Sequence, residues 1–207
     1  MGWRALLDLL FPPQCAGCNA LGSGLCDTCA GACERIRVRF PLLRVTACGA
    51  YEGNLRAAVL ALKDGRRDVA EALGRTVAPL ILPGSLLVPI PTTMRRRRVR
   101  GFDGVAAVAR HAAIISGARV ALALEQRAGD AQRGRSRTQR LAARGRFACD
   151  PGAVSACRVT LFDDVCTTGS TLRDCAGAVR EAGGLVEDAV VVAVTKSGSP
   201  WSLPNVS

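Results

Sequence analysis

The stretch Val159–Thr171, which reads VTLFDDVCTTGST, decides how this chain folds. A short, mostly apolar run leads into two adjacent acids, and a turn of hydroxyl residues and glycine follows at once. The next residues, Leu172–Ala182, have the character of a helix that ends at Gly183-Gly184, and the apolar run Val186–Val194 comes after them. A strand, a turn, a helix with a glycine cap and a second strand make one parallel βαβ unit. We therefore predict an α/β fold with a parallel sheet flanked by helices.

The turn of this unit is suited to hold a phosphate, because it places hydroxyls and unpaired N–H groups at a helix N-terminus. Its residues are Thr167, Thr168, Gly169, Ser170 and Thr171. Asp163 and Asp164 end the preceding strand, where carboxylates can bind sugar hydroxyls or a metal ion; the alternative is that they only cap the strand end and the turn. P-loop NTPases also carry an acidic strand end, but they need a Gly-Lys dipeptide, and this chain has none.

The whole run resembles the ribose-phosphate motif of type I phosphoribosyltransferases, which joins four largely apolar residues, two acids and a Thr-Thr-Gly-x-Thr loop. The resemblance implies that Asp163 and Asp164 hold the ribose 2′ and 3′ hydroxyls of phosphoribosyl pyrophosphate. It also implies that residues 167–171 hold the 5′-phosphate, and that Mg²⁺ binds with the ligand, mainly through ligand oxygens and water. Purine-salvage members often have Asp at the first loop position, where this chain has Thr167.

The length and composition of the chain indicate the size of the fold and the charge of the partners that it favours. A chain of 207 residues is long enough for one ordinary domain and a small appendage. Hydrophobic residues make up 49% of it and aromatic residues only 4%, so we expect an aliphatic core. The net charge of +11 favours polyanionic partners such as nucleic acid or phosphate-rich ligands, although genomic base bias can also enrich arginine.

From the sequence we expect no targeting or membrane segment. The short apolar stretch Ala5–Phe11 is interrupted by Asp8 and ended by Pro12-Pro13, and no later segment holds eighteen uninterrupted apolar residues. We therefore expect no membrane span and a cytoplasmic location. In that compartment the ten cysteines of the chain are more often metal ligands than disulfide partners.

Two CxxC pairs near the start of the chain predict a metal site. Their residues are Cys15, Cys18, Cys26 and Cys29, and seven residues separate the two pairs. Two such turns can close a tetrahedron around Zn²⁺, and a segment this short needs the metal to fold. We predict a structural zinc module; an iron–sulfur site or a redox pair is the alternative. Cys33 breaks the spacing and is left out.

Two segments concentrate arginine. The first follows the predicted buried strand Leu86–Pro91, at the edge of a parallel sheet where ligands bind. There we assign Arg97 and Arg98 to the pyrophosphate leaving group, as catalytic residues. The alternative is a solvated nucleic-acid patch. The residues that we assign to nucleic acid are Arg95, Arg96 and Arg100, together with Arg133, Arg135 and Arg137 of the second segment.

The second segment, Arg127–Arg146, is rich in arginine and glycine. Its position inside the α/β domain favours a flap that closes on the ligand, and a disordered basic linker is the alternative.

Further motifs follow one another along the chain: the cysteine quartet, Tyr51-x-Gly53, Leu62-Lys63, Val88-Pro89-Ile90-Pro91, Arg100-Gly101-Phe102, Gln132-x3-Ser136-Arg137 and the acidic loop. This combination, over roughly residues 6 to 196, resembles the ComF family, which joins a zinc finger to a phosphoribosyltransferase-like domain. Members usually continue Arg-Gly-Phe with Asn-Gln, where this chain has Asp103-Gly104.

The resemblance implies a type I phosphoribosyltransferase-like sheet, and with the motifs above it divides the chain into three parts. We expect an N-terminal helix and zinc module in residues 1–47, the phosphoribosyltransferase-like domain in residues 48–196, and a polar tail in residues 197–207.

Two functions from different classes are considered, and we favour a protein that keeps the phosphoribosyl pyrophosphate site and has a DNA-linked role over a phosphoribosyltransferase of nucleotide or base salvage without DNA binding. The first is a transferase that moves the phosphoribosyl group to an acceptor by positioning and charge stabilisation. The second is an accessory protein in the uptake or processing of transforming DNA, as the ComF resemblance implies, in which the site is a sensor and arginines bind single strands. Because aromatic residues are few, such binding would be largely electrostatic.

Overall fold

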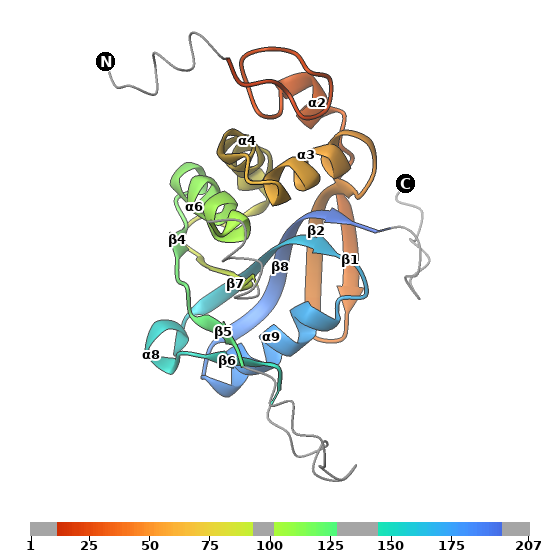
Figure 1. The fold of residues 1–207 in the computed structure, drawn as a ribbon. Coiled ribbons are helices and arrows are strands. Elements are labelled where there is room, and N and C mark those ends of the chain that lie inside the picture. Colours follow the sequence, from red (N-terminus) through yellow and green to blue (C-terminus); the bar gives the residue numbers. More distant parts are fainter. Residues whose placement is uncertain (1–11, 93–101, 128–144, 196–207) are drawn as a thin grey trace, which may run out of the picture.

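A computed structural model describes residues 12–92, 102–127 and 145–195 (Figure 1). Its centre is a six-stranded sheet with the strand order β1-β2-β8-β7-β3-β4. The strands are β1 (Ile36–Phe40), β2 (Leu43–Ala50), β3 (Leu86–Pro89), β4 (Arg119–Val120), β7 (Arg158–Cys166) and β8 (Leu185–Val194). Every neighbouring pair in this sheet is parallel except β1 and β2, which form an antiparallel hairpin. The mostly parallel α/β sheet predicted from the sequence is confirmed.

Helices cover both faces of the sheet. The helices on one face are α3 (Gly53–Lys63), α4 (Arg67–Val77) and α6 (Gly104–Ser116), and α9 (Ser170–Glu181) packs on the other. A small antiparallel pair, β5 (Leu124–Gln126) and β6 (Phe147–Cys149), lies beside α9. The remaining short elements are α2 (Asp27–Gly31), the 3₁₀ turn η1 (Ala78–Leu80) and α8 (Pro151–Val154).

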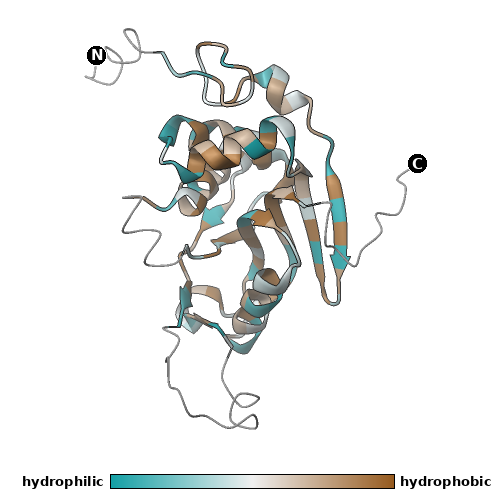
Figure 2. Ribbon diagram, turned by 45° about the vertical axis from the view of Figure 1, so that its right-hand side comes forward, coloured by the Kyte–Doolittle hydropathy of each residue, from teal (hydrophilic) through white to brown (hydrophobic). Residues whose placement is uncertain are grey.

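The period-two pattern of β7 explains why two layers of helices form. Phe162 packs into the apolar cluster beneath α3, α4 and α6, whereas Val159 and Leu161 pack into the cluster beneath α9. A strand buried on both faces reads as the continuous apolar run seen in the sequence. Figure 2 shows the apolar residues of the sheet lying between the helices.

The sheet reverses its winding between β3 and β7, which are neighbours. The chain passes from β3 through α6 to β4 on one side, and from β7 through α9 to β8 on the other side. In open α/β sheets, ligands bind at such a switch point, outside the carboxyl ends of the strands. The acidic pair of the sequence motif lies on β7 at this edge of the sheet.

The cysteine-rich segment, residues 12–33, packs on α3 and α4 at one end of the molecule (Figure 1). Cys15, Leu25 and Cys29 are buried in the same apolar cluster as Leu55 and Val59. The boundary expected between residues 47 and 48 falls inside β2, and the central sheet already begins at Ile36. The reason is that β2 pairs with both β1 and β8, so the hairpin belongs to the sheet.

None of the helices in the described ranges combines the length and the apolar character needed to cross a membrane.

Candidate functional site

The acidic pair is held by short hydrogen bonds at the carboxyl end of β7. Asp163 Oδ1 accepts the N–H of Asp164 at 2.8 Å, and Asp164 Oδ1 accepts the N–H of Val165 at 2.7 Å. Lys63 Nζ, from the last residue of α3, lies 3.2 Å from Asp164 Oδ2. Each carboxylate is therefore oriented by a backbone donor, and one of them also has an ammonium partner.

The surroundings oppose ionisation of Asp163. Burial raises the pKa of this carboxyl well above 3.8, and the charge of Asp164 raises it further, while the Asp164 N–H and Lys63 act in the lowering direction. Two carboxylates at adjacent positions of a buried strand therefore repel each other within the fold. Sugar hydroxyls that donate hydrogen bonds to these oxygens would relieve that repulsion.

The loop after β7 requires glycine at one position. Gly169 has φ of +70°, and a Cβ there would lie 2.4 Å from the ring of Phe40 on β1. A side chain at this position would therefore strain the backbone and collide with an aromatic ring that is buried. The ring of Phe40 therefore packs directly against the loop at Gly169.

The start of α9 offers donors to an anion. Ser170 begins the helix, its N–H reaches Thr168 Oγ1 at 3.4 Å, and the hydroxyls of Thr168 and Ser170 are 3.2 Å apart. Thr167 and Thr168 are exposed, and Thr171 is half-buried. No acid stands in the first turn of α9, and the N-cap residue, Gly169, has no side chain that could cap the helix. The positive end of the helix dipole is thus open to a phosphate.

The predicted arginine sites lie outside the described residues. They are Arg95, Arg96, Arg97, Arg98, Arg100, Arg133, Arg135 and Arg137. The residues that flank the first of these segments meet beside β7: Ile90 N–H donates to Phe162 O at 2.8 Å, and Thr92 Oγ1 donates to Asp103 Oδ1 at 3.3 Å. Thr92 and Asp103, the described residues on either side of the first arginine segment, are therefore in contact with each other.

Asp103 has a clear local role. Its Oδ1 accepts the N–H of Ala106 at 3.1 Å, so it is the N-cap of α6. Asn and Asp are similarly good N-caps, so either residue at position 103 would fill this role.

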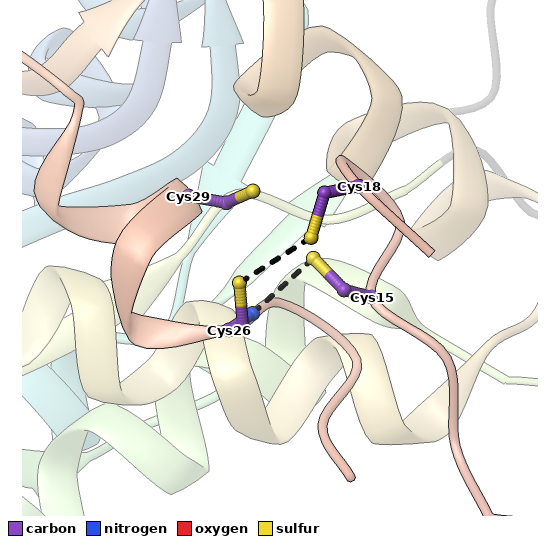
Figure 3. A group of neighbouring side chains, drawn as sticks. All are labelled: Cys15, Cys18, Cys26 and Cys29. Carbon is purple, nitrogen blue, oxygen red and sulfur yellow. Dashed lines mark hydrogen bonds between the residues drawn. The ribbon is translucent and has the colours of Figure 1, made fainter. Parts of the chain in front are cut away.

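The structure brings the four predicted cysteines together (Figure 3). The sulfur atoms of Cys15, Cys18, Cys26 and Cys29 all lie within 4.8 Å of one another, and those of Cys18 and Cys26 are 3.6 Å apart. A zinc–sulfur bond of about 2.3 Å places the sulfur atoms of a tetrahedron about 3.8 Å apart. The cluster therefore fits a tetrahedrally coordinated metal ion, and its cysteine-only donor set suits zinc or iron.

Backbone donors prepare this cluster for thiolate ligands. The N–H groups of Gly17 and Cys26 point to Cys15 Sγ at 3.4 and 3.3 Å. Burial acts to raise the pKa of Cys15, but the backbone N–H donors outweigh it and lower the pKa to about 6. Burial raises the pKa of Cys29, so this thiol needs a cation to ionise. The Cys33 thiol donates to the carbonyl of Cys29 and is not part of the cluster.

Sequence reasoning assigned no role to two residues of the acidic site, Lys63 and Phe40. Lys63 is part of the Leu62-Lys63 motif. Because it lies near the end of an amphipathic helix, the sequence predicted only that the helix ends there. Phe40 belongs to a hairpin 129 positions before Gly169 (169 − 40), a separation at which no local pattern signals contact.

No family model matches the chain, and no curated protein matches it. Among solved structures, the allosteric regulatory enzyme of purine biosynthesis is 20% identical, with a TM-score of 0.46 over 66% of this chain and 30% of that one. Glutamine phosphoribosylpyrophosphate amidotransferase from B. subtilis, complexed with ADP and GMP, is 21% identical, with a TM-score of 0.48 over 64% and 30%. The chain thus spans about 30% of the length of these two proteins.

A purine phosphoribosyltransferase from Pyrococcus horikoshii Ot3 is 16% identical, with a TM-score of 0.31 over 74% of this chain and 93% of that one. At these levels of similarity we base the function on the residues of the site.

Proposed function

We propose that this protein binds phosphoribosyl pyrophosphate with Mg²⁺ at the end of β7. The observation that carries the proposal is one βαβ unit, at the switch point of the sheet, that joins a half-buried acidic pair to a helix N-terminus whose N-cap residue is glycine. Asp163 and Asp164 would accept hydrogen bonds from the ribose hydroxyls. Residues 167–171 would hold the 5′-phosphate, and Arg97 and Arg98 the pyrophosphate.

The same site supports phosphoribosyl transfer, which is the alternative to a pure binding role. In that reaction a nitrogen of the acceptor forms a bond to ribose C1, the bond from C1 to the pyrophosphate oxygen breaks, and the acceptor loses a proton. Mg²⁺, held mainly by ligand oxygens and water, would supply charge to the departing pyrophosphate. The residues of this chain would contribute binding and orientation, which are the main sources of rate in such reactions.

For the cysteine cluster we propose one structural zinc per chain. The support is the sulfur geometry, the backbone donors to Cys15 and the lack of an independent core in residues 12–33. Zinc thiolates are compatible with the reducing cytoplasm, the location that we propose for the protein.

Titration calorimetry with phosphoribosyl pyrophosphate in MgCl₂ tests the binding function. We expect saturable binding at one site per chain, and competition by ribose 5-phosphate, because the two ligands share the ribose hydroxyls and the phosphate. Absence of heat and of competition at millimolar ligand would refute the proposal. Exchange of labelled pyrophosphate across a panel of bases then separates the two roles, since turnover requires transfer.

One observation favours a second function, association with nucleic acid in DNA uptake or processing. Arg35, Arg37 and Arg39 are exposed, and within the described part of the chain no acid forms an ion pair with them. Polar and apolar residues alternate along β1 (Figure 2), so Arg37 and Arg39 share one face of this edge strand. Arg39 also lies directly opposite Arg44, a like-charge pair that costs stability. A phosphate backbone would neutralise this arginine stripe, residues 35, 37 and 39.

Anisotropy titrations of a labelled oligo-dT strand over a range of salt concentrations test the stripe. We expect Arg37→Ser with Arg39→Ser to flatten the slope of log affinity against log salt by about 1.4, using roughly 0.7 per lost phosphate contact. The matched control is Arg119→Ser with Arg158→Ser, which removes two exposed arginines from other strands. Equal slopes in both double variants would instead mean that the stripe only protects the sheet edge from pairing.

A further inference from the structure

Lys63 is the cation of the described chain that forms an ion pair with the acidic pair. Its ammonium group lies 3.2 Å from Asp164 Oδ2, and the two side chains are 30% and 19% exposed. The contact is therefore partly shielded from water, where an ion pair is worth more than on an open surface. It joins two elements that are far apart in sequence, α3 and β7.

The choice of lysine here is unusual for this chain. Only Lys63 and Lys196 are lysines, so 26 of the 28 basic residues are arginine (28 − 2). A bias toward arginine that comes from base composition would not explain the exception at residue 63. An ammonium is a compact point charge that can contact a single carboxylate oxygen, whereas a guanidinium forms a wide fork.

Helix α3 fixes the position of Lys63 because both of its ends contact the cysteine module. At the first turn, Gly17 packs so closely that a Cβ there would lie 2.8 Å from Asn54 Oδ1 and 2.9 Å from Cys29 Sγ. Just beyond the last turn, Arg66 donates a hydrogen bond to the carbonyl of Gln14. The body of the helix is buried through Leu55, Ala58, Val59 and Leu62. Helix α3, packed on both the cysteine module and the core, therefore holds Lys63 next to Asp164.

We propose that Lys63 is a positioning residue of the ribose-binding site: its ammonium holds the Asp164 carboxylate in the orientation that accepts the ribose hydroxyls. The inference rests on the proposed function. It assigns Lys63 to the ribose, through Asp164, and not to the pyrophosphate, because the ammonium group contacts the acid. The charge of Lys63 also offsets the repulsion between Asp164 and Asp163.

The test compares three ligands on the full chain: phosphoribosyl pyrophosphate, ribose 5-phosphate and inorganic pyrophosphate. We expect Lys63→Met to weaken the first two by a similar factor, about tenfold, and to leave inorganic pyrophosphate unchanged. Lys63→Arg, which keeps the charge, should recover part of the loss. Weakened binding of inorganic pyrophosphate, with ribose 5-phosphate unchanged, would overturn the proposal in favour of a direct contact to the leaving group.

A double-mutant cycle with Asp164→Asn separates positioning from a general effect on the fold. If Lys63 acts through Asp164, Lys63→Met should cost nothing further in the Asp164→Asn background. A tenfold loss in both backgrounds would overturn the proposal, because the lysine would then act independently of the acid. Melting temperatures of all variants control for folding.

The outcomes also distinguish this inference from the function on which it rests. If the wild-type protein binds neither phosphoribosyl pyrophosphate nor ribose 5-phosphate, both fail. If the wild-type protein binds them and Lys63→Met binds equally well, only the role of Lys63 is overturned.

Discussion

The chain has two clusters of side chains that could bind a ligand, one of thiols and one of carboxylates. The two clusters differ in what holds them together. Four thiols meet in the cysteine module, where backbone donors favour thiolate and a cation would complete the site. Two carboxylates meet at the end of β7, where burial and the neighbouring Asp164 oppose the charge of Asp163. In the first cluster the bound ion would support the fold, and in the second the fold holds two carboxylates side by side against their repulsion.

This difference explains why the clusters should respond in opposite ways to substitution. Removing a metal ligand takes away folding energy, because residues 12–33 have little core of their own. Replacing the Asp163 carboxylate by an amide relieves the repulsion and takes away only binding. Stability and ligand affinity, measured separately, therefore distinguish a structural cluster from a functional one.

The largest effect should follow from breaking the cysteine cluster. We expect Cys18→Ser to lose the zinc and at least about 4 kcal/mol of the free energy of unfolding, because the module then has no cross-link. Metal analysis and denaturant titration measure the two quantities. Cys33→Ser is the matched control, since its thiol lies beside the cluster but outside it, and it should keep one zinc per chain. Folded protein without zinc, or with an iron–sulfur chromophore, would contradict this account of the module.

A smaller effect should follow from a methyl group in the phosphate loop. Gly169→Ala places a Cβ against the Phe40 ring at a positive φ, so we expect a loss of about 2 kcal/mol in stability together with weaker binding of ribose 5-phosphate. Gly177→Ala is the control: this glycine lies inside α9 with open space around it, and alanine there should stabilise the helix by about 0.5–1 kcal/mol. Equal stability of the two variants would show that Phe40 does not support the loop.

The smallest effect is a gain in stability instead of a loss, and it concerns the acidic pair. Folding raises the pKa of Asp163, chiefly through burial and then through Asp164, so above pH 3.8 the folded state binds more protons than the unfolded state. The free energy of unfolding should therefore fall as pH rises from 3.8 through the raised pKa.

The substitution Asp163→Asn removes this dependence of the free energy of unfolding on pH. We expect the variant to be more stable than the wild type above the raised pKa, and the two proteins to differ little near pH 4. Urea titrations at several pH values measure the difference. A wild-type protein that is more stable than the variant at high pH would contradict the strain that we assign to the pair.

The sequence was most informative where the contacts are local. The unit from Val159 to Val194 was predicted as strand, helix and strand. Its apolar periodicity and its Gly183-Gly184 helix cap both lie within one continuous segment. The cysteine spacing likewise predicted a cluster that the structure brings together.

Contacts between distant segments were not predictable in this way. Neither the approach of Phe40 to Gly169 nor the ion pair between Lys63 and Asp164 leaves a local signal, because each depends on the order of strands in the sheet. Residues 36–47 were assigned to the N-terminal module for the same reason, and no strand was predicted there. Nothing local in the sequence identifies β8 as the neighbour of β2.

The most direct test of the proposed ligand site is calorimetry of phosphoribosyl pyrophosphate with the double variant Asp163→Asn and Asp164→Asn. We expect a folded protein whose affinity is at least about a hundredfold lower, since losing two charge-assisted hydrogen bonds costs on the order of 3 kcal/mol. Asp188→Asn, which removes an acid paired with Arg44 elsewhere on the sheet, should bind as the wild type does. Unchanged affinity in the double variant would contradict the assignment of this acidic pair to the ribose.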